Sequence, residues 1–516
     1  MINNYLDILA KTIIENWNQP ALTDFYLTDD NTAQDTSRGN HYTYGEMYAE
    51  IVRVADYLER LGLNQGDHIV ICGANSSHWV IAYFAIAKMQ GVSVTIMHSL
   101  MPEQIAEMVR VSDAKALFTD EDIWAELQDQ SMPQVHTIVS LADWSCLEST
   151  THQLFTDSTP IFLQDVSFPH YEPNALAMIC FTSGTEGMPK GVMLSYRNIS
   201  VNLGYSAEYS SSNINTISAL PMAHMYGLLT ELLYSLYYGK HLNILSSTIG
   251  MNMYPMCCRI IQPLIVLLVP SVLEKLINNI RLHPCQGTLR DNIYRLFGDK
   301  IVSIAVSGAK MTIELESILI KSNLPMVFAY ASTECLRIAE SAIKIHRIGS
   351  AGKLLDNIQA RIAPNGEILV KGENVMLGYY KNPEATAQKI DADGWLHTGD
   401  RGYLDEDGYL YVEGRLEQDM IVLPNGENIH PDNIENKINA LPEVAESIVI
   451  AREGKLVAIV VVSGDLSADS RKALRLSILR SVNAQLPMYA QIYDVEWSEE
   501  PLVRTAKQTL KRHLYK

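Results

Sequence analysis

The sequence feature that most constrains the fold is a regular alternation of helix-like and strand-like segments between residues 42 and 120. Segments 42–63 and 76–91 have the spacing of apolar residues that is typical of helices. Segments 66–75 and 92–97 are short apolar runs that read as buried strands. Strands that alternate with helices indicate parallel pairing with crossover helices, so we predict a layered α/β fold.

The pattern changes in the last third of the chain, where turns join successive strands. Segments 357–376 and 402–415 read as strands with Pro-Asn-Gly and Glu-Asp-Gly at the bends. We therefore expect an antiparallel, β-barrel-like subdomain over about 345–415. The remaining residues have the pattern of a small α+β unit. The predicted organisation is a large N-terminal domain, 1–415, and a small C-terminal domain, 416–516.

The formal net charge of −19 argues against one broad class of function. Non-specific nucleic-acid binding needs a basic footprint, although a local pocket could still hold a polyphosphate. The N-terminus lacks a basic region followed by an apolar one, and prolines interrupt the most apolar stretch, 260–276. We expect no signal peptide and no transmembrane segment. Seven cysteines without a Cys-x-x-Cys pair or zinc-ligand spacing favour a cytoplasmic protein.

The stretch ICFTSGTEGMPKGVMLSYRNI, residues 179–199, is the most informative part of the sequence. An apolar strand runs into a loop whose candidate phosphate-binding residues are Thr182, Ser183, Gly184, Thr185, Gly187 and Lys190. Small residues expose backbone N–H groups and hydroxyls to a phosphate chain, and the lysine adds positive charge. The spacing is not that of a Walker A loop. The alternative is an ordinary glycine-rich turn.

The same loop resembles a signature of the adenylate-forming superfamily, which includes acyl- and aryl-CoA synthetases, adenylation domains and firefly luciferase. Other strings fit the family's order along nearly the whole chain. They are LPMAHMYG (220–227), AVSGAKM (305–311), YASTE (330–334), GSAGKLL (349–355), GEILVKGENVMLGYYKNPEAT (366–386), GWLHTGD (394–400), GYLYVEGR (408–415) and NGENIHPDNIE (425–435). The segment VPSVLEKL, 269–276, is similar to long-chain fatty acid–CoA ligases.

The resemblance implies a reaction in two steps. A carboxylate attacks the α-phosphate of ATP to give an acyl-adenylate and pyrophosphate, and the thiol of coenzyme A then takes the acyl group. Negative charge builds up on phosphate and carboxylate oxygens, so fixed donors, a cation and Mg²⁺ are needed around them. We therefore expect ATP, Mg²⁺ and coenzyme A to serve an acid–thiol ligase.

The resemblance also assigns roles to residues around the phosphates. The loop Thr182–Lys190 would wrap the β- and γ-phosphates. In YASTE, Tyr330 would lie against adenine, Thr333 would bond the α-phosphate, and Glu334 would bind Mg²⁺. The alternative for YASTE is a strand end followed by a helix N-cap.

Further roles concern the ribose and the acyl group. Asp400 would accept both ribose hydroxyls, because one carboxylate with two oxygens suits a vicinal diol. Arg415 would bond ribose or phosphate, unless it forms a surface salt bridge. Gly308 and Ala309 would line the adenine and acyl pocket. His224 would act where the acyl group meets the pantetheine arm, and its alternative is a core or capping histidine.

The tail PLVRTAKQTLKRHLYK, 501–516, is basic although the chain is acidic. Relatives usually place a catalytic lysine here, which lowers the repulsion between the carboxylate and the α-phosphate. Without a gap the alignment puts Thr509 at that position. We predict that Lys507 takes the role, with Lys511 as the other candidate. Arg512 still fits a solvated basic helix.

The apolar segments 224–245 and 261–280 favour a medium- or long-chain fatty acid as the substrate. One alternative is an enzyme that loads the phosphopantetheine of a carrier protein. Another is a catalytically weak nucleotide-binding relative, because Glu186 and Ala331 depart from the family's usual residues. The hinge between the domains would lie at one of the residues 417–419.

Overall fold

The computed structural model describes most of the chain. The described residues are 4–515 without 31, 148–159, 183–188, 205–213, 247, 248, 250, 283–286, 309, 310, 312, 343, 344, 417–420, 424–426, 430, 465 and 504–511. In these parts of the chain, every helix is too short or too polar to span a bilayer.

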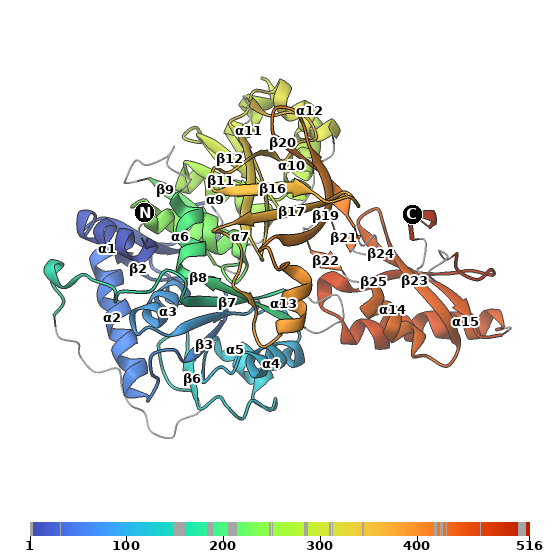
Figure 1. The fold of residues 1–516 in the computed structure, drawn as a ribbon, viewed down its shortest axis with the longest axis horizontal. Coiled ribbons are helices and arrows are strands. Elements are labelled where there is room, and N and C mark those ends of the chain that lie inside the picture. The colour runs from blue at the N-terminus through green and yellow to red at the C-terminus, as the bar shows by residue number, and fades with distance from the viewer. Residues whose placement is uncertain are drawn as a thin grey trace.

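A seven-stranded sheet forms one layer of the large domain (Figure 1). Its order is β18 (Gly378–Tyr379), β8 (Lys190–Ser195), β7 (Leu176–Thr182), β4 (Val92–Thr95), β3 (His68–Cys72), β5 (Ala116–Thr119) and β6 (Thr137–Ser140). The strands from β7 to β6 pair in parallel, whereas β8 and β18 run antiparallel to their neighbours. The predicted alternation of parallel strands and helices is confirmed.

The helices of this layer follow from local sequence signals. They are α1 (Tyr5–Glu15), α2 (Tyr44–Arg60), α3 (Ser77–Lys88), α4 (Pro102–Val111), α5 (Glu121–Leu127) and α6 (Tyr196–Gly204). A capping box of Thr43 and Glu46 starts α2. The residues of α3 from Ser77 to Ala87 are all buried, because this helix is apolar on every side and packs inside the domain.

A four-stranded sheet brings the N-terminal strands beside a segment far along the chain. Its order is β2 (His41–Thr43), β1 (Pro20–Phe25), β10 (His241–Leu245) and β9 (Asn215–Ser218). The helical segments after β9 and β10 are α7 (Met225–Gly227), the π-helix η3 (Leu228–Leu233), α8 (Tyr234–Tyr237), η4 (Met251–Met253) and α9 (Tyr254–Ile261). This arrangement packs the segment around His224 against the end of β9.

A nine-stranded sheet forms the rest of the large domain. Its order is β11 (Ile265–Leu268), β12 (Ser303–Val306), β13 (Met326–Ser332), β14 (Leu336–Ala342), β15 (Gly352–Leu354), β20 (Tyr409–Arg415), β19 (Leu396–Leu404), β17 (Glu367–Gly372) and β16 (Ile358–Ile362). Its helices are α10 (Pro270–Leu282), α11 (Leu289–Phe297), α12 (Ile313–Lys321) and α13 (Pro383–Lys389). The antiparallel strands expected after residue 345 are present, and they extend the sheet of the preceding strands instead of standing apart.

The C-terminal residues form a small α+β unit with its own apolar core, drawn in orange and red at one side of the molecule (Figure 1). Its strands are β21 (Ile421–Val422), β22 (Asn428–Ile429), β23 (Val444–Arg452), β24 (Lys455–Val462) and β25 (Ile492–Trp497). Its helices are α14 (Pro431–Asn439), α15 (Ala468–Ser477) and the π-helix η6 (Ile478–Val482). The remaining short turns of helix are η1 (Leu163–Asp165), η7 (Asn483–Gln485), η8 (Met488–Ala490) and η9 (Arg512–Leu514).

Candidate active site

The two ends of the predicted phosphate loop lie side by side. Thr182 ends β7 and Lys190 begins β8, and the two residues are partners in the antiparallel ladder. The Thr182 hydroxyl donates to the Lys190 carbonyl at 3.5 Å. The Lys190 Nζ lies 5.5 Å from the centre of the Tyr379 ring. Ser183, Gly184, Thr185 and Gly187 lie outside the described residues.

Strand β18, which carries Tyr379, connects Glu334 to the end of the predicted phosphate loop. The Tyr379 hydroxyl donates to Glu334 Oε1 at 3.0 Å, and the Met376 N–H donates to the Glu334 carbonyl at 2.8 Å. Burial and the neighbouring Glu334 carboxylate raise the pKa of Tyr379, so its hydroxyl stays a donor. The contacts therefore link the Glu334 carboxylate through Tyr379 to Lys190, at the end of the predicted phosphate loop.

The surroundings of Glu334 fit a magnesium ion that is shared with a nucleotide. Among the described residues, no group of three or more His, Cys, Asp or Glu side chains could hold a metal by itself. Mg²⁺ is commonly bound through one or two carboxylates together with substrate phosphates. A single half-buried carboxylate next to a phosphate loop suits that mode. Thr333 lies in the same turn between β13 and β14.

Tyr330 and Asp400 come together from distant parts of the chain. The Tyr330 hydroxyl donates to Asp400 Oδ2, across 70 residues of sequence. Burial, followed by the Asp400 carboxylate, raises the pKa of Tyr330 well above its ordinary value. Asp400 is 7% exposed. The structure thus joins the residues predicted to contact adenine and ribose.

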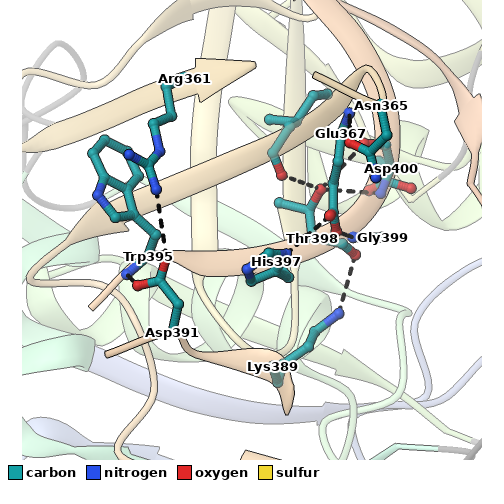
Figure 2. A network of polar contacts seen from close by, with 11 residues as sticks. Arg361, Asn365, Glu367, Lys389, Asp391, Trp395, His397, Thr398, Gly399 and Asp400 are labelled. Atoms are coloured by element: carbon teal, nitrogen blue, oxygen red, sulfur yellow. Dashed lines mark hydrogen bonds and ion pairs between the residues drawn. The ribbon is translucent and has the colours of Figure 1, made fainter. Parts of the chain in front are cut away.

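Asp400 lies at the end of a network of polar contacts that sequence reasoning missed (Figure 2). The buried Glu367 accepts the Gly399 N–H at 3.0 Å and bonds the His397 ring at 2.9 Å. Lys389 donates to the carbonyl of Thr398 at 3.1 Å. Only the motif strings around Glu367 and His397 signalled these residues, and the strings do not reveal which side chains meet.

His224 caps a helix, as its alternative reading proposed. The Tyr226 N–H donates to His224 Nδ1 at 3.2 Å, at the start of α7. The His224 side chain is exposed, yet desolvation by the surrounding protein lowers its pKa. The imidazole is therefore neutral near pH 7.

The segment before His224 is attached to the carboxyl ends of the parallel strands. The Thr95 hydroxyl of β4 donates to the Ala223 carbonyl at 3.2 Å, and Cys180 of β7 contacts the same oxygen. The Tyr226 hydroxyl donates to the Ala305 carbonyl at 3.4 Å, three residues before Gly308. Gly308 has a φ of +92° and is exposed, and Ala309 lies outside the described residues.

Glu231 is a second residue that sequence reasoning missed. Its Oε2 accepts the Ser218 hydroxyl and the N–H groups of Ala219 and Leu220, each at 3.0 Å. Burial raises the pKa of Glu231 to about 8. This carboxylate therefore holds the chain just before the segment that carries His224. An acidic residue within an apolar helical run was the available signal.

The predicted residues at the domain boundary and in the C-terminal unit are only partly described. The backbone of Arg415 pairs with that of Asp400 across β19 and β20, but its side chain, Lys507, Lys511 and the hinge 417–419 lie outside the described residues.

The expectation for Arg512 was wrong. Its side chain is 3% exposed and forms a buried ion pair with Glu435. Two buried charges need each other as partners, so Arg512 anchors the end of the tail.

Two family models identify the family to which this chain belongs. The model for the AMP-binding enzyme matches residues 18–380, and the model for the AMP-binding enzyme C-terminal domain matches residues 418–516. This chain belongs to the AMP-binding enzyme family. The predicted membership of the adenylate-forming superfamily is confirmed, and so is the α/β fold with a separate C-terminal domain.

Relatives in the AMP-binding family include several CoA ligases. A 2-succinylbenzoate–CoA ligase of Oceanobacillus iheyensis is 30% identical over 441 residues, which cover 82% of this chain and 83% of the relative. A 4-coumarate–CoA ligase 4 of Arabidopsis thaliana is 24% identical and covers 89% of this chain and 83% of its own length.

Solved structures show the same AMP-binding fold. The o-succinylbenzoate CoA synthetase of Bacillus subtilis, bound with the product analogue OSB-NCoA, matches with a TM-score of 0.77 and 24% identity over 99% of this chain and 97% of that chain. The same enzyme was also solved with AMP. The predicted ligands ATP, Mg²⁺ and coenzyme A are those that AMP-binding CoA ligases use. The domain boundary at 415, the residue roles and the cytoplasmic location stay predictions.

Proposed function

We propose that the protein is an ATP-dependent acid–CoA ligase that forms an acyl-adenylate and then a thioester. One observation carries the proposal: Tyr379 links Lys190 to Glu334 at the end of the predicted phosphate loop, in a chain of the AMP-binding family. Charge that develops on phosphate oxygens is best stabilised by groups that are already fixed in place. This arrangement supplies a cation and a metal-binding carboxylate at one position.

Each half of the nucleotide has its own residues in this proposal. Tyr330 lies against adenine while its hydroxyl orients Asp400, which accepts the ribose hydroxyls. Thr333 donates to the α-phosphate, and Glu334 holds Mg²⁺, which neutralises phosphate charge when it is bound.

Lys507 is brought in by the C-terminal unit to receive the incoming carboxylate. His224 stands where the acyl group meets the thiol.

The identity of the carboxylic acid substrate is a more specific part of the proposal, and two observations bear on it. The first apolar segment that favoured a medium- or long-chain fatty acid, 224–245, is largely buried over α7, η3, α8 and β10, and the second, 261–280, contributes β11 and the buried side of α10. The 30% identical relative is a 2-succinylbenzoate–CoA ligase, which favours an aromatic acid with a second carboxylate. We rank the fatty acid first because apolar side chains dominate these segments, and the aromatic acid second.

An acid panel tests the function directly. Exchange of labelled pyrophosphate into ATP is measured with fatty acids of increasing chain length, 2-succinylbenzoate and 4-coumarate, and thioester formation is then followed with coenzyme A. Strong exchange with fatty acids supports the first candidate, whereas exchange confined to 2-succinylbenzoate supports the second. A thioester on a phosphopantetheinylated carrier but not on coenzyme A would point to carrier loading. AMP binding without exchange on any acid would overturn the ligase proposal.

A further inference from the structure

The backbone that presents Asp400 is irregular on both sides. The β17–β19 ladder changes register between Glu367 and Leu369, and the β19–β20 ladder changes register between Arg401 and Gly402. Where a ladder is interrupted, backbone N–H groups need other acceptors, because an unpaired buried N–H is costly. The Gly399 N–H and the Asp400 N–H both donate to side chains here.

Glu367 supplies the first of these acceptors. Its Oε1 accepts the Gly399 N–H at 3.0 Å, and its Oε2 lies 2.9 Å from His397 Nδ1. Glu367 is 7% exposed, so its carboxylate is largely shielded from bulk water, although the His397 side chain is partly exposed. Gly399 has a φ of +76°, a conformation that suits glycine, and this turn aims its N–H at the carboxylate.

Thr398 supplies the second acceptor, and its hydroxyl ties the segment 397–400 to the neighbouring strand β17. Its hydroxyl donates to the Ile368 carbonyl at 2.7 Å and accepts the Asp400 N–H at 3.0 Å. Glu367 and Ile368 are adjacent on β17. This strand therefore holds residues 397–400 at two points, through the Glu367 side chain and through the bond between the Thr398 hydroxyl and the Ile368 carbonyl. Figure 2 shows Thr398 and Glu367 beside Asp400, and the contact of the Thr398 hydroxyl with the Asp400 N–H.

We propose that Glu367 is a positioning residue for nucleotide binding. Its carboxylate fixes His397 and Gly399, and thereby sets the direction in which Asp400 faces the ribose. The inference rests on the proposed function in one respect, namely that Asp400 receives the ribose hydroxyls. A carboxylate that must bond two hydroxyls while it accepts the Tyr330 hydroxyl tolerates little rotation.

Asp391 provides a matched comparison at the other end of the same region. Its Oδ1 accepts the N–H groups of Asp393 and Trp395 at 3.0 and 2.8 Å, and its Oδ2 lies 3.4 Å from Arg361. It is thus a carboxylate that holds a turn of backbone near β19, as Glu367 does. Figure 2 shows it with Arg361 and Trp395, apart from the group around Asp400.

Calorimetric titration of the whole protein with AMP and with 2′-deoxy-AMP tests the inference without any knowledge of the acid. The ratio of the two dissociation constants measures how well the 2′-hydroxyl is recognised. We expect the wild-type protein to bind 2′-deoxy-AMP about tenfold more weakly, as the loss of a hydrogen bond to a charged group implies. Glu367→Ala should bring this ratio close to one. Glu367→Gln keeps an oxygen for the Gly399 N–H and should restore most of the ratio.

The control is Asp391→Ala, which should keep the wild-type ratio even if it lowers the melting temperature as much as Glu367→Ala does. A wild-type ratio near one would overturn the role of Asp400 in ribose binding. A normal wild-type ratio that Glu367→Ala leaves unchanged would overturn the positioning role of Glu367 alone. Equal loss of the ratio in the Glu367 and Asp391 variants would also overturn it. If Glu367→Ala does not fold, His397→Ala, at a more exposed position, serves as the second test and should also lower the ratio.

Discussion

Two buried glutamates hold two functional segments of this protein, and they do so in different ways. Glu367 bonds the Gly399 N–H through one oxygen and the His397 ring through the other. Glu231 collects three donors on Oε2, whereas its Oε1 has no hydrogen-bond partner among the described residues. The segment that presents Asp400 is thus held by a carboxylate with both oxygens bonded. The segment before His224 depends on a carboxylate that burial drives toward its neutral form.

The comparison shows that two buried carboxylates can order backbone segments by similar hydrogen bonds and still differ in how completely their own oxygens are bonded. A carboxylate that bonds backbone N–H groups orders a segment in both places. At Glu367 both carboxylate oxygens have a hydrogen-bond partner. At Glu231 burial raises the pKa, so the protonation state of this residue and the stability of the protein are linked. The acyl side of the proposed site is therefore expected to depend on pH.

The largest effect is expected on the nucleotide side, at Asp400 itself. Asp400→Ala removes the acceptor for the Tyr330 hydroxyl and for the ribose, so kcat/KM for ATP in the adenylation step should fall by about 100-fold. The measurement is pyrophosphate exchange at varied ATP concentration. The KM for the acid should change little. A larger change for the acid than for ATP would contradict the division into two sides.

The next effect is expected on the acyl side, at Glu231. Glu231→Ala leaves the Ser218 hydroxyl and the N–H groups of Ala219 and Leu220 without their acceptor, which should lower the free energy of unfolding by about 3 kcal/mol. Urea denaturation measures the loss. In the folded variant the KM for the acid should rise more than the KM for ATP, and the reverse order would break the comparison.

A smaller effect is expected where the two sides meet, at Tyr379. Tyr379→Phe removes the hydrogen bond to Glu334, so kcat/KM for Mg-ATP should fall by about tenfold while thioester formation from supplied acyl-adenylate is retained. The neighbouring Tyr380 donates to the exposed Asp113, and Tyr380→Phe is the matched control. Equal losses in both variants would show that Tyr379 contributes only to packing.

The last effect is a pH dependence of stability that arises from Glu231. The folded protein keeps the Glu231 proton up to a pKa of about 8, whereas the unfolded chain releases it near the ordinary value of 4.5. Between these values the folded state binds more protons, so the stability contributed by this group falls as the pH rises. Glu231→Gln removes this slope, so the free energy of unfolding of the variant should rise relative to that of the wild-type protein as the pH increases from 5 to 8. Parallel stability curves from chemical denaturation would contradict the assignment.

The sequence predicted the secondary structure well because its signals are local. The helix pattern in 42–63 became α2, and the apolar run in 66–75 became β3. Likewise the small residues of 182–190 predicted a phosphate loop, and the structure places Thr182 and Lys190, its two ends, side by side. Periodicities of 3.6 and 2 and the chemistry of turns can be read within a few residues.

The sequence failed where a residue's role depends on a distant partner. Arg512 looked like a solvated cation in a basic tail, but its partner Glu435 lies 77 residues earlier and buries it. Glu231 looked like one polar position in an apolar helical run. Its three donors all come from the strand end and turn before that helix.

The sequence by itself determined the α/β alternation, the order of the motifs and the membership of the adenylate-forming superfamily, since each is written in short stretches of chain. Only the tertiary structure decided which side chains orient the site. Tyr330 meets Asp400 across 70 residues, and Tyr379 meets Glu334 across 45. Such contacts arise because three sheets fold distant segments against one another, and no local periodicity encodes them.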